Sequence, residues 1–342
     1  MQPKDRTRPS IDPRRLLERE GNDALAEILA GAGYLIQRRL LIDLAHALGS
    51  RKPLLIEGPR GGGKTALAEA LATGCNLPSF YLQGMEGLTL ADVLYDWDRE
   101  GQTQMVRQEL AAGTKLREAQ DKQFTREYLI PGEALGAFEY AGTHAETPIL
   151  IIDEADKLSE KIEDMFLQLL GRGWAHVPRY GDIGVRDPER WPIVFLLSND
   201  IRHDLSAPLR SRCLYTWLDP PTPREEVRIL RARAPMATRE LLTCIAKLIN
   251  CIRRDMPAVR DKPGLRESID LIEALAKAGV ESLTAAVIDE HLCFLGKRHK
   301  ELLNLRHGIA RLEFAAHMPD EEIDEWVASA FENEDYMLQS TT

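Results

Sequence analysis

The amino-acid sequence predicts an α/β domain built on a parallel sheet, followed by an all-helical domain. Short, continuously apolar segments alternate with segments of helical apolar spacing over roughly the first two thirds of the chain. Apolar runs of this kind are typical of strands buried on both faces, as in a parallel sheet flanked by helices. A proline cluster, Asp219–Pro223, then precedes a stretch with helical patterns only. This change of pattern predicts a domain boundary at the prolines.

Length and composition are those of a globular protein of about two domains. The chain has 342 residues, of which 44% are hydrophobic and 29% charged. The formal net charge of −10 argues against a protein that coats nucleic acid, because such proteins carry a basic excess. Five cysteines without a C-x-x-C pair indicate neither a disulfide framework nor a zinc site. The sequence has no apolar run long enough for a membrane span and no signal-peptide core, so a cytoplasmic protein is expected.

The elements follow from the apolar spacing. Strands are expected within Lys52–Pro59 and at Ser79–Leu82, Pro148–Ile152 and Pro192–Leu197. Helices are expected at Leu25–Leu48 and Lys64–Ala72, and beyond the prolines at 223–233, 237–254, 264–279 and 284–305. The expected organisation is an N-terminal arm (1–23), an α/β domain (24–219), a helical domain (220–316) and a C-terminal tail (317–342).

The two ends of the chain differ in charge. The first 20 residues mix basic and acidic side chains with three prolines, which is typical of a loose arm or a short helix at the edge of the fold. From His317 to Thr342 there are eight acidic residues and no Lys or Arg. Such a run favours a solvated acidic tail, and a segment that docks on a basic partner is the alternative.

A phosphate-binding motif follows the first expected strand. The letters Gly58-Pro-Arg-Gly-Gly-Gly-Lys64-Thr65 fit G-x-x-x-x-G-K-[ST] between a strand and a helix, which is the context the motif requires. The glycines let backbone N–H groups turn toward phosphate oxygens at a helix N-terminus. Lys64 is expected to reach the β- and γ-phosphates, and the Thr65 hydroxyl to ligate Mg²⁺. The candidate loop residues are Gly58, Pro59, Arg60, Gly61, Gly62, Gly63, Lys64, Thr65 and Ala66.

Two carboxylates end the third expected strand. After the apolar run Ile149–Ile152 come Asp153 and Glu154. In a metal-dependent phosphoryl-transfer site, one carboxylate of such a pair binds the metal and the other acts on the attacking water. Asp153 is expected to hold the Mg²⁺ shell, and Glu154 to orient or deprotonate the attacking water.

Three further polar positions belong to the predicted site. Asn199 follows the fourth expected strand, where ligands bind in open α/β sheets, although an Asn there can also cap the next helix. Arg210 and Arg212 lie near the domain edge, where an arginine can reach into the site of a neighbouring subunit. Surface arginines are the alternative. Arg266 begins a helix of the second domain.

With these motifs in this order, the chain resembles the AAA+ ATPases, and within them the MoxR branch, over most of residues 24–305. Finer features, at Gly33–Leu35, Leu94–Asp98 and Arg212–Trp217, are similar to the CoxD-like subgroup. The segment Ala175–Gly184 is similar to a hairpin that this clade inserts ahead of the first sensor. The insert after Tyr95 is similar to an extra element in the family's second helix region.

The resemblance implies a P-loop AAA+ domain with a parallel sheet flanked by helices, followed by an all-helical lid. It implies that Asn199 is the first sensor, Arg212 the arginine finger with Arg210 as the alternative, and Arg266 the second sensor. It also implies that Tyr34 or Leu35 touches adenine. The cofactors would be ATP and Mg²⁺. The assembly would be a homo-oligomeric ring, usually hexameric, that remodels client proteins with a von Willebrand factor A domain partner.

Two other functions stay open at this level. Ser211-Arg-Cys213 resembles clamp loaders, so a DNA-directed motor of clamp-loader or branch-migration type is one alternative. The acidic net charge argues against nucleic acid as a partner. A slow ATP-dependent assembly switch is the other alternative, and the presence of both Asp153 and Glu154 favours turnover over it. Stimulation of ATPase activity by a partner protein, by DNA or by neither separates the three.

Overall fold

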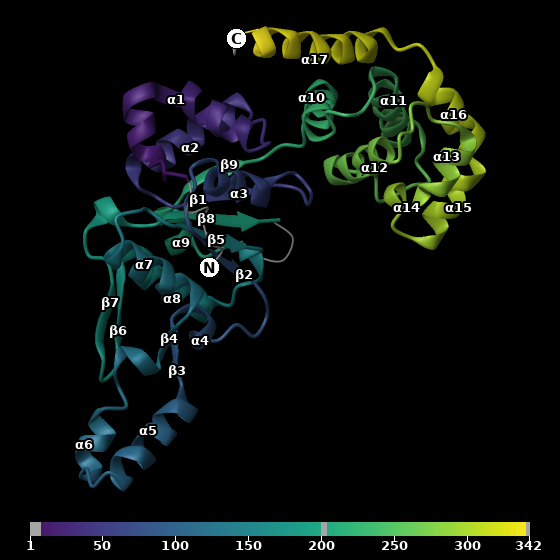
Figure 1. Ribbon diagram of the computed structural model, residues 1–342. Coiled ribbons are helices and arrows are strands. Elements are labelled where there is room, and N and C mark those ends of the chain that lie inside the picture. The colour runs from purple at the N-terminus through teal and green to yellow at the C-terminus, as the bar shows by residue number, and fades with distance from the viewer. Residues whose placement is uncertain (1–7, 200–203, 340–342) are drawn as a thin grey trace. The chain divides into compact units, whose positions relative to one another are not determined.

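The computed structural model describes residues 8–199 and 204–339 (Figure 1). The chain divides into two compact units: Met1–Pro59 with Gly63–Leu218, and Arg60–Gly62 with Asp219–Thr342. The division after Leu218 falls just before the proline cluster. Among the helices of the described residues, none combines the length and apolar composition that crossing a bilayer requires.

A five-stranded parallel sheet forms the centre of the first unit. Its strands are β1 (Leu54–Glu57), β2 (Ser79–Gln83), β5 (Ile149–Asp153), β8 (Ile193–Ser198) and β9 (Leu214–Trp217). Their order in the sheet is β2-β5-β8-β1-β9, and every neighbouring pair is parallel. The predicted fold class, a parallel sheet flanked by helices and followed by an all-helical region, is confirmed.

Helices cover both faces of this sheet. Alternate residues of β1 separate the two cores: Leu54 and Ile56 pack with one set of helices, and Leu55 belongs to the opposite core. The first set is α1 (Pro13–Gly31), α2 (Arg38–Ser50) and α3 (Lys64–Gly74), and the second includes α7 (Glu133–Thr143) and α8 (Glu160–Arg172). Figure 1 shows these groups on opposite sides of the strands. Because both faces are buried, the strands are continuously apolar.

The fifth strand, β9, is absent from the sequence prediction. It lies at the edge of the sheet beside β1, and its burial alternates. Tyr215 and Trp217 are exposed, whereas Thr216 is buried and donates a hydrogen bond to Asp43 (2.8 Å). A strand with one exposed face lacks the continuous apolar run that predicted the other four.

Two excursions leave the first unit, as the resemblance implied. The antiparallel strands β3 (Tyr95–Trp97) and β4 (Leu129–Pro131) enclose α5 (Arg99–Ala111), α6 (Leu116–Asp121) and the short helix Arg126–Tyr128, and α4 (Leu90–Val93) precedes them. The expected hairpin is confirmed as β6 (Trp174–Val177) and β7 (Gly181–Gly184). The Arg179 guanidinium at its turn lies 3.8 Å from the ring centre of Phe124 and pairs with Asp121 at 3.6 Å. The two excursions therefore support each other.

The N-terminal segment is anchored: of the two expectations, a loose arm or a short helix at the edge of the fold, the described residues show a helix. Helix α1 starts at Pro13 and runs past the expected boundary at residue 23, with a kink at Gly21 (φ 80°). Arg14 is 6% exposed and donates to the carbonyl oxygens of Glu189, Trp191 and Pro192 (3.4, 2.9 and 3.3 Å). Burial lowers the pKa of its guanidinium to about 10. The charged sequence around Arg14 is typical of a surface segment, but the Arg14 guanidinium is buried and joins α1 to the loop before β8.

Replacing Arg14 with alanine should destabilise the first unit by about 3 kcal/mol, because three carbonyl groups, that of Pro192 buried, lose a charged donor. Chemical denaturation followed by circular dichroism measures this change in the free energy of unfolding. Arg15→Ala is the matched control, since the Arg15 side chain is 76% exposed. Equal stability of the two variants would contradict the anchoring role.

The second unit is all-helical in its described residues 219–339. Its helices are α10 (Pro223–Arg233), α11 (Arg239–Asp255), α12 (Leu265–Lys277), α13 (Ala285–Glu290), α14 (Leu292–Leu295), α15 (His299–His307), α16 (Ile309–His317) and α17 (Glu321–Gln339). The Thr222 and Glu225 side chains form a capping box at the start of α10, and Pro223 follows the cap, so the proline cluster starts a helix. The single helix expected over 284–305 is three helices, since His291 (φ −109°, ψ 11°) ends α13 and Gly296, with extended backbone angles, ends α14.

The described part of the acidic C-terminal segment is helical and its side chains up to Phe331 pack on the second unit, which corrects the expectation of a solvated tail there. Ile323, Val327 and Ala330 of α17 are buried in the core of the second unit, and α17 packs on α10 and α11. Asp324 pairs with Lys247 at 2.7 Å, and the Lys247 side chain is 8% exposed. Apolar residues at helical spacing are enough to bury one stripe of an otherwise acidic helix.

Candidate nucleotide site

The phosphate loop joins β1 to α3, and its glycines are required by the backbone. Gly58 and Gly63 have φ angles of 155° and 90°, a region that favours glycine. A Cβ atom on Gly58 would lie 2.4 Å from the carbonyl oxygen of Leu218. Gly63 is the N-cap of α3, so the loop ends at a helix N-terminus of the kind that binds phosphate. Phosphate binding remains a prediction for the other candidate loop residues, which are Arg60, Gly61, Gly62 and the exposed Ala66.

Lys64 is a buried cation held by oxygen atoms. Its Nζ donates to the carbonyl oxygens of Gly58 and Pro59 (2.8 Å each) and to Oδ1 of Asn199 (2.9 Å). Strands β1 and β8 are neighbours, with Glu57 opposite Ser198, which brings Asn199 to the loop. A phosphate oxygen is a stronger partner for an ammonium group than a carbonyl, so this lysine is preset for an anionic ligand.

Thr65 and Asp153 meet at the start of α3. The Thr65 hydroxyl donates to Oδ2 of Asp153 at 2.8 Å, and the backbone N–H of Glu154 donates to Oδ1 at 2.8 Å. A hydroxyl and a carboxylate in contact are the hard oxygen ligands that Mg²⁺ prefers. The residues present therefore fit the metal that the motif implies.

Glu154 is strained and held by two donors. Its φ of 51° is in the left-handed region, which is unusual for a residue other than glycine and is typical of functional sites. Its Oε2 accepts from Nε2 of Gln83 at 2.5 Å and forms an ion pair with Lys157. The backbone just after β2 packs closely against Glu154, since a Cβ atom on Gly84 would lie 2.2 Å from the Glu154 carbonyl oxygen.

Two residues of this site, Tyr81 and Gln83, are missing from the sequence prediction. The Tyr81 hydroxyl lies 2.6 Å from Oε1 of Gln83 and 3.0 Å from Oδ2 of Asp153. Strand β2 pairs with β5 so that Gln83 stands opposite Asp153. Burial and the nearby Asp153 carboxylate raise the pKa of Tyr81, which keeps the hydroxyl protonated. Gln83 is a polar residue just after the expected strand Ser79–Leu82, and this position could have marked it as a site residue. The sequence does not show that this strand lies beside the one that ends in Asp153.

Tyr34 packs against the end of the phosphate loop. Its ring carbon Cε2 lies 3.5 Å from the position that a Cβ on Gly63 would take. Burial raises the pKa of its hydroxyl. Leu35, next to it, is half-buried. The contact of Tyr34 or Leu35 with adenine stays a prediction.

Two of the candidate arginines, Arg210 and Arg212, contact their own neighbours along the chain. Arg210 pairs with Asp204 (3.6 Å), and Arg212 donates to the carbonyl oxygen of Pro208 (3.0 Å), both around the short helix α9 (Ala207–Arg212). Both are exposed, as a residue that acts on another subunit must be. Arg266 is exposed in the first turn of α12, and its Cβ lies 3.7 Å from the position that a Cβ on Gly61 of the phosphate loop would take. The roles of these three arginines stay predictions.

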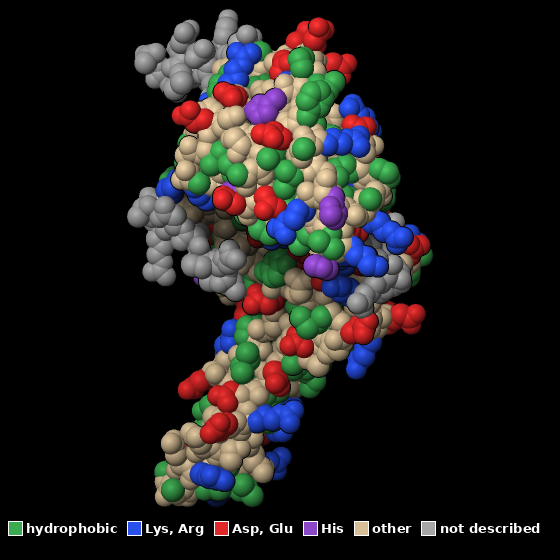
Figure 2. Space-filling view, turned by 90° about the vertical axis from the view of Figure 1, so that its right-hand side faces the viewer, with side chains coloured by type: hydrophobic (Ala, Val, Ile, Leu, Met, Phe, Trp, Pro, Cys, Tyr) green, Lys and Arg blue, Asp and Glu red, His purple; other side chains and the backbone are tan. Residues whose placement is uncertain are grey.

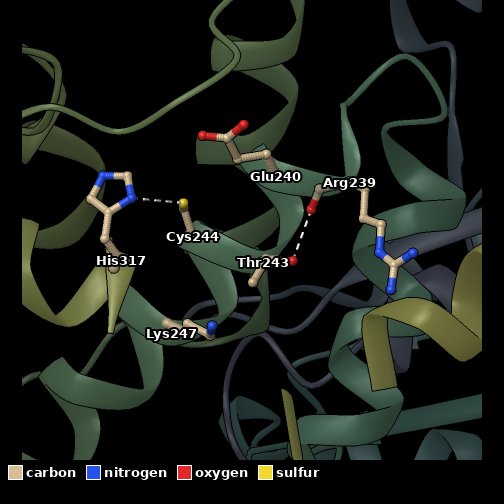
Figure 3. A pocket seen from close by; sticks show the side chains of 7 residues that line it. Arg239, Glu240, Thr243, Cys244, Lys247 and His317 are labelled. Carbon is tan, nitrogen blue, oxygen red and sulfur yellow. Dashed lines mark hydrogen bonds between the residues drawn. The ribbon is translucent and has the colours of Figure 1, made fainter. Parts of the chain in front are cut away.

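A separate pocket in the second unit contains a cysteine and a histidine (Figure 3). Cys244 Sγ of α11 lies 3.8 Å from Nδ1 of His317, whose Nε2 is 2.8 Å from the Leu283 carbonyl oxygen. Burial raises the pKa of the Cys244 thiol. Across residues 8–199 and 204–339, no group of three or more His, Cys, Asp and Glu side chains is arranged to hold a metal. The contact is a thiol–imidazole hydrogen bond.

Comparisons with known proteins agree with this geometry. Residues 53–213 match the profile of the AAA domain (dynein-related subfamily). The first unit has the AAA+ P-loop fold. The match spans the AAA+ phosphate loop, both carboxylates, Asn199 and both candidate arginines of α9. A comparison with curated protein sequences finds no match.

Among solved structures, the chain is similar to RuvB of Thermotoga maritima. One mutant form is 17% identical over 79% of this chain and 73% of that chain, with a TM-score of 0.45. A second is 19% identical over 78% and 70%, with a TM-score of 0.43. The Holliday junction branch migration motor itself is 17% identical over 82% and 73%, with a TM-score of 0.41. These scores are too low to support an argument about function.

Proposed function

We propose that this chain binds ATP with Mg²⁺, hydrolyses it to ADP and phosphate, and uses the turnover to remodel a client protein. The observation that supports this best is the meeting of Thr65 with Asp153 at 2.8 Å beside the strained Glu154. A hydroxyl and a carboxylate for a metal, next to a second carboxylate, are the parts that phosphoryl transfer from ATP to water requires.

Each residue has a defined task in this proposal. The phosphate loop and Lys64 bind and orient the phosphates, and Thr65 and Asp153 hold Mg²⁺. When bound, the metal neutralises charge that develops on the phosphate oxygens. Glu154 accepts a proton from the attacking water at Oε1, while the Gln83 and Lys157 donors on Oε2 hold the carboxylate in position. Asn199, already 2.9 Å from Lys64, orients the water toward the γ-phosphate.

A ring of identical subunits completes the proposed site. AAA+ proteins commonly assemble into rings, and the exposed Arg212, or Arg210, would act on ATP bound by the adjacent subunit. We propose six subunits in the cytoplasm, with a von Willebrand factor A domain protein as the partner. The resemblance to the MoxR branch supports both parts of this proposal.

The α5–α6 excursion is the proposed client surface. Figure 2 shows acidic, basic and apolar side chains interspersed over its exposed face. Leu110 and Leu116, near the connection between the two helices, are 42% and 53% exposed. The contacts of Arg179 with Asp121 and Phe124 brace this excursion against the β6–β7 hairpin.

The deciding experiment measures ATP turnover of the purified chain together with its mass in the presence and absence of ATP. Turnover is then repeated with a von Willebrand factor A domain protein and with branched DNA. Stimulation by the protein supports the remodelling function. Stimulation by DNA alone favours the DNA-directed alternative. Assembly on ATP without turnover favours an assembly switch and contradicts the proposed hydrolysis.

A further inference from the structure

We propose that a cavity at the amino end of the parallel sheet binds a small oxyanion, the phosphate or carboxylate group of a polar ligand, through Arg14 and Arg51. The cavity has a volume of about 360 Å³, which is within the range of small-molecule sites. Its lining includes charged side chains of α1 and of the loops that precede β1, β5 and β8. Because the strands are parallel, this end of the sheet is opposite to the carboxyl ends that carry Asp153 and Asn199. The proposed site is therefore separate from the nucleotide site.

Two arginine nitrogens of the lining have hydrogen-bonding capacity that the fold does not use. Nε of Arg14 and Nε of Arg51 are buried, and neither has an acceptor in the part of the chain that the structure describes. Arg14 as a whole is 6% exposed, and its Nη atoms already donate to three backbone carbonyl oxygens. A buried donor without an acceptor is destabilising. Two such donors on one polar cavity indicate a ligand that accepts hydrogen bonds.

The acidic side chains of the lining already have donors of their own. Those with a donor among the described residues are Asp12, Glu146, Asp187 and Glu189. Glu18 is exposed, where water can solvate it. The buried hydrogen-bonding capacity left over in the described lining is therefore that of cations, and it matches an anionic ligand rather than a cationic one.

The charges next to the two arginines also favour an anion. One residue, Glu189, is shared between them: its carbonyl oxygen accepts from Nη1 of Arg14 at 3.4 Å, and its carboxylate forms an ion pair with Arg51. That carboxylate is 65% exposed, so solvent screens its charge. Burial lowers the pKa of Arg14, and the positive charge of Arg51 lowers it as well, while Asp12 and Glu189 oppose the shift. The two guanidinium groups are thus near enough to repel each other, and an oxyanion bound by both would relieve this repulsion.

The test measures thermal unfolding of the whole chain in sodium phosphate, sodium malonate and sodium chloride at equal ionic strength. An anion that binds only the folded chain raises Tm with its concentration, so the rise reports its affinity. For Arg51→Lys, which keeps the charge but lacks the guanidinium fork, we expect about tenfold weaker binding. For Glu189→Gln we expect about threefold tighter binding, because Arg51 loses a competing carboxylate. Arg19→Lys, at an exposed position of α1 outside the cavity, should match the wild type.

The opposite signs of the two variants separate a binding site from structural damage. A rise in Tm beyond that in chloride, smaller in Arg51→Lys and larger in Glu189→Gln, supports the site, and the more effective anion shows whether the ligand carries a phosphate or a carboxylate. Equal Tm values in the three salts overturn the proposal. So does an Arg51→Lys variant that keeps the full response, even if its Tm in chloride is lower, or a Glu189→Gln variant whose response does not increase.

Phosphate bound at the phosphate loop does not affect this comparison, because the variants share that loop. The titrations are repeated in a Lys64→Ala background, where the difference between Arg51→Lys and its parent should persist. Its disappearance there would place the anion at the phosphate loop and overturn the proposal. The readout is independent of ATP turnover, so failure of the proposed function and failure of this site are distinguishable.

Discussion

Replacement of Glu154 by glutamine is expected to abolish ATP turnover while ATP still binds. Glutamine keeps the shape of the side chain but cannot accept the proton of the attacking water, and loss of a general base costs about 10²–10⁴-fold in rate. The phosphate contacts through Lys64 and the α3 N-terminus are unaffected. Steady-state phosphate release and fluorescent-nucleotide binding measure the two quantities on the same preparation.

Glu160→Gln is the matched control for this experiment. Glu160 is an exposed carboxylate in the first turn of α8, only six positions along the chain. It should retain wild-type turnover. Equal turnover of Glu154→Gln and the wild type would mean that another group activates the water. A variant that binds ATP without hydrolysing it would also stabilise the assembled state, so the mass in ATP should be at least that of the wild type.

Replacement of Lys64 by alanine is expected to weaken ATP binding about 100-fold, equivalent to about 2.7 kcal/mol. The Lys64 ammonium group is buried and already lies within 2.9 Å of three oxygen atoms around the phosphate loop. A charge-assisted bond to phosphate in such a site is among the strongest that a side chain makes. Isothermal titration calorimetry with ATP and Mg²⁺ measures the change.

Lys52→Ala controls for the loss of one positive charge. Lys52 is exposed just before β1 and outside the phosphate loop. Its removal should leave ATP affinity within about twofold of the wild type, since exposed charges contribute little. If both variants bound ATP equally well, the phosphate loop would not be the nucleotide site.

The contiguous parts of the site were predictable because their geometry is local. The Gly58–Thr65 loop needs only the φ angles that glycine allows and the helix that follows. Asp153 and Glu154 are marked by the end of an apolar strand. These patterns extend over few residues, so short-range sequence information is sufficient for them.

The parts that depend on strand order were not predictable in the same way. Tyr81 and Gln83 join the site because β2 lies beside β5, and no local pattern in residues 79–83 specifies that neighbour. The edge strand β9 was missed since one of its faces is exposed. Arg14 has the sequence context of a surface residue, and its burial depends on the loop before β8, about 175 residues away.

The sequence by itself determined the fold class and the positions of the phosphate loop and of the two carboxylates, because apolar spacing and glycine conformations act over neighbouring residues. The tertiary structure alone decided that Tyr81 and Gln83 contact those carboxylates, that Asn199 meets Lys64, and that the acidic helix α17 closes the second core. Contacts of that kind form between elements distant along the chain. Their free energy comes from packing and hydrogen bonds that exist only once the sheet order and the helix positions are established.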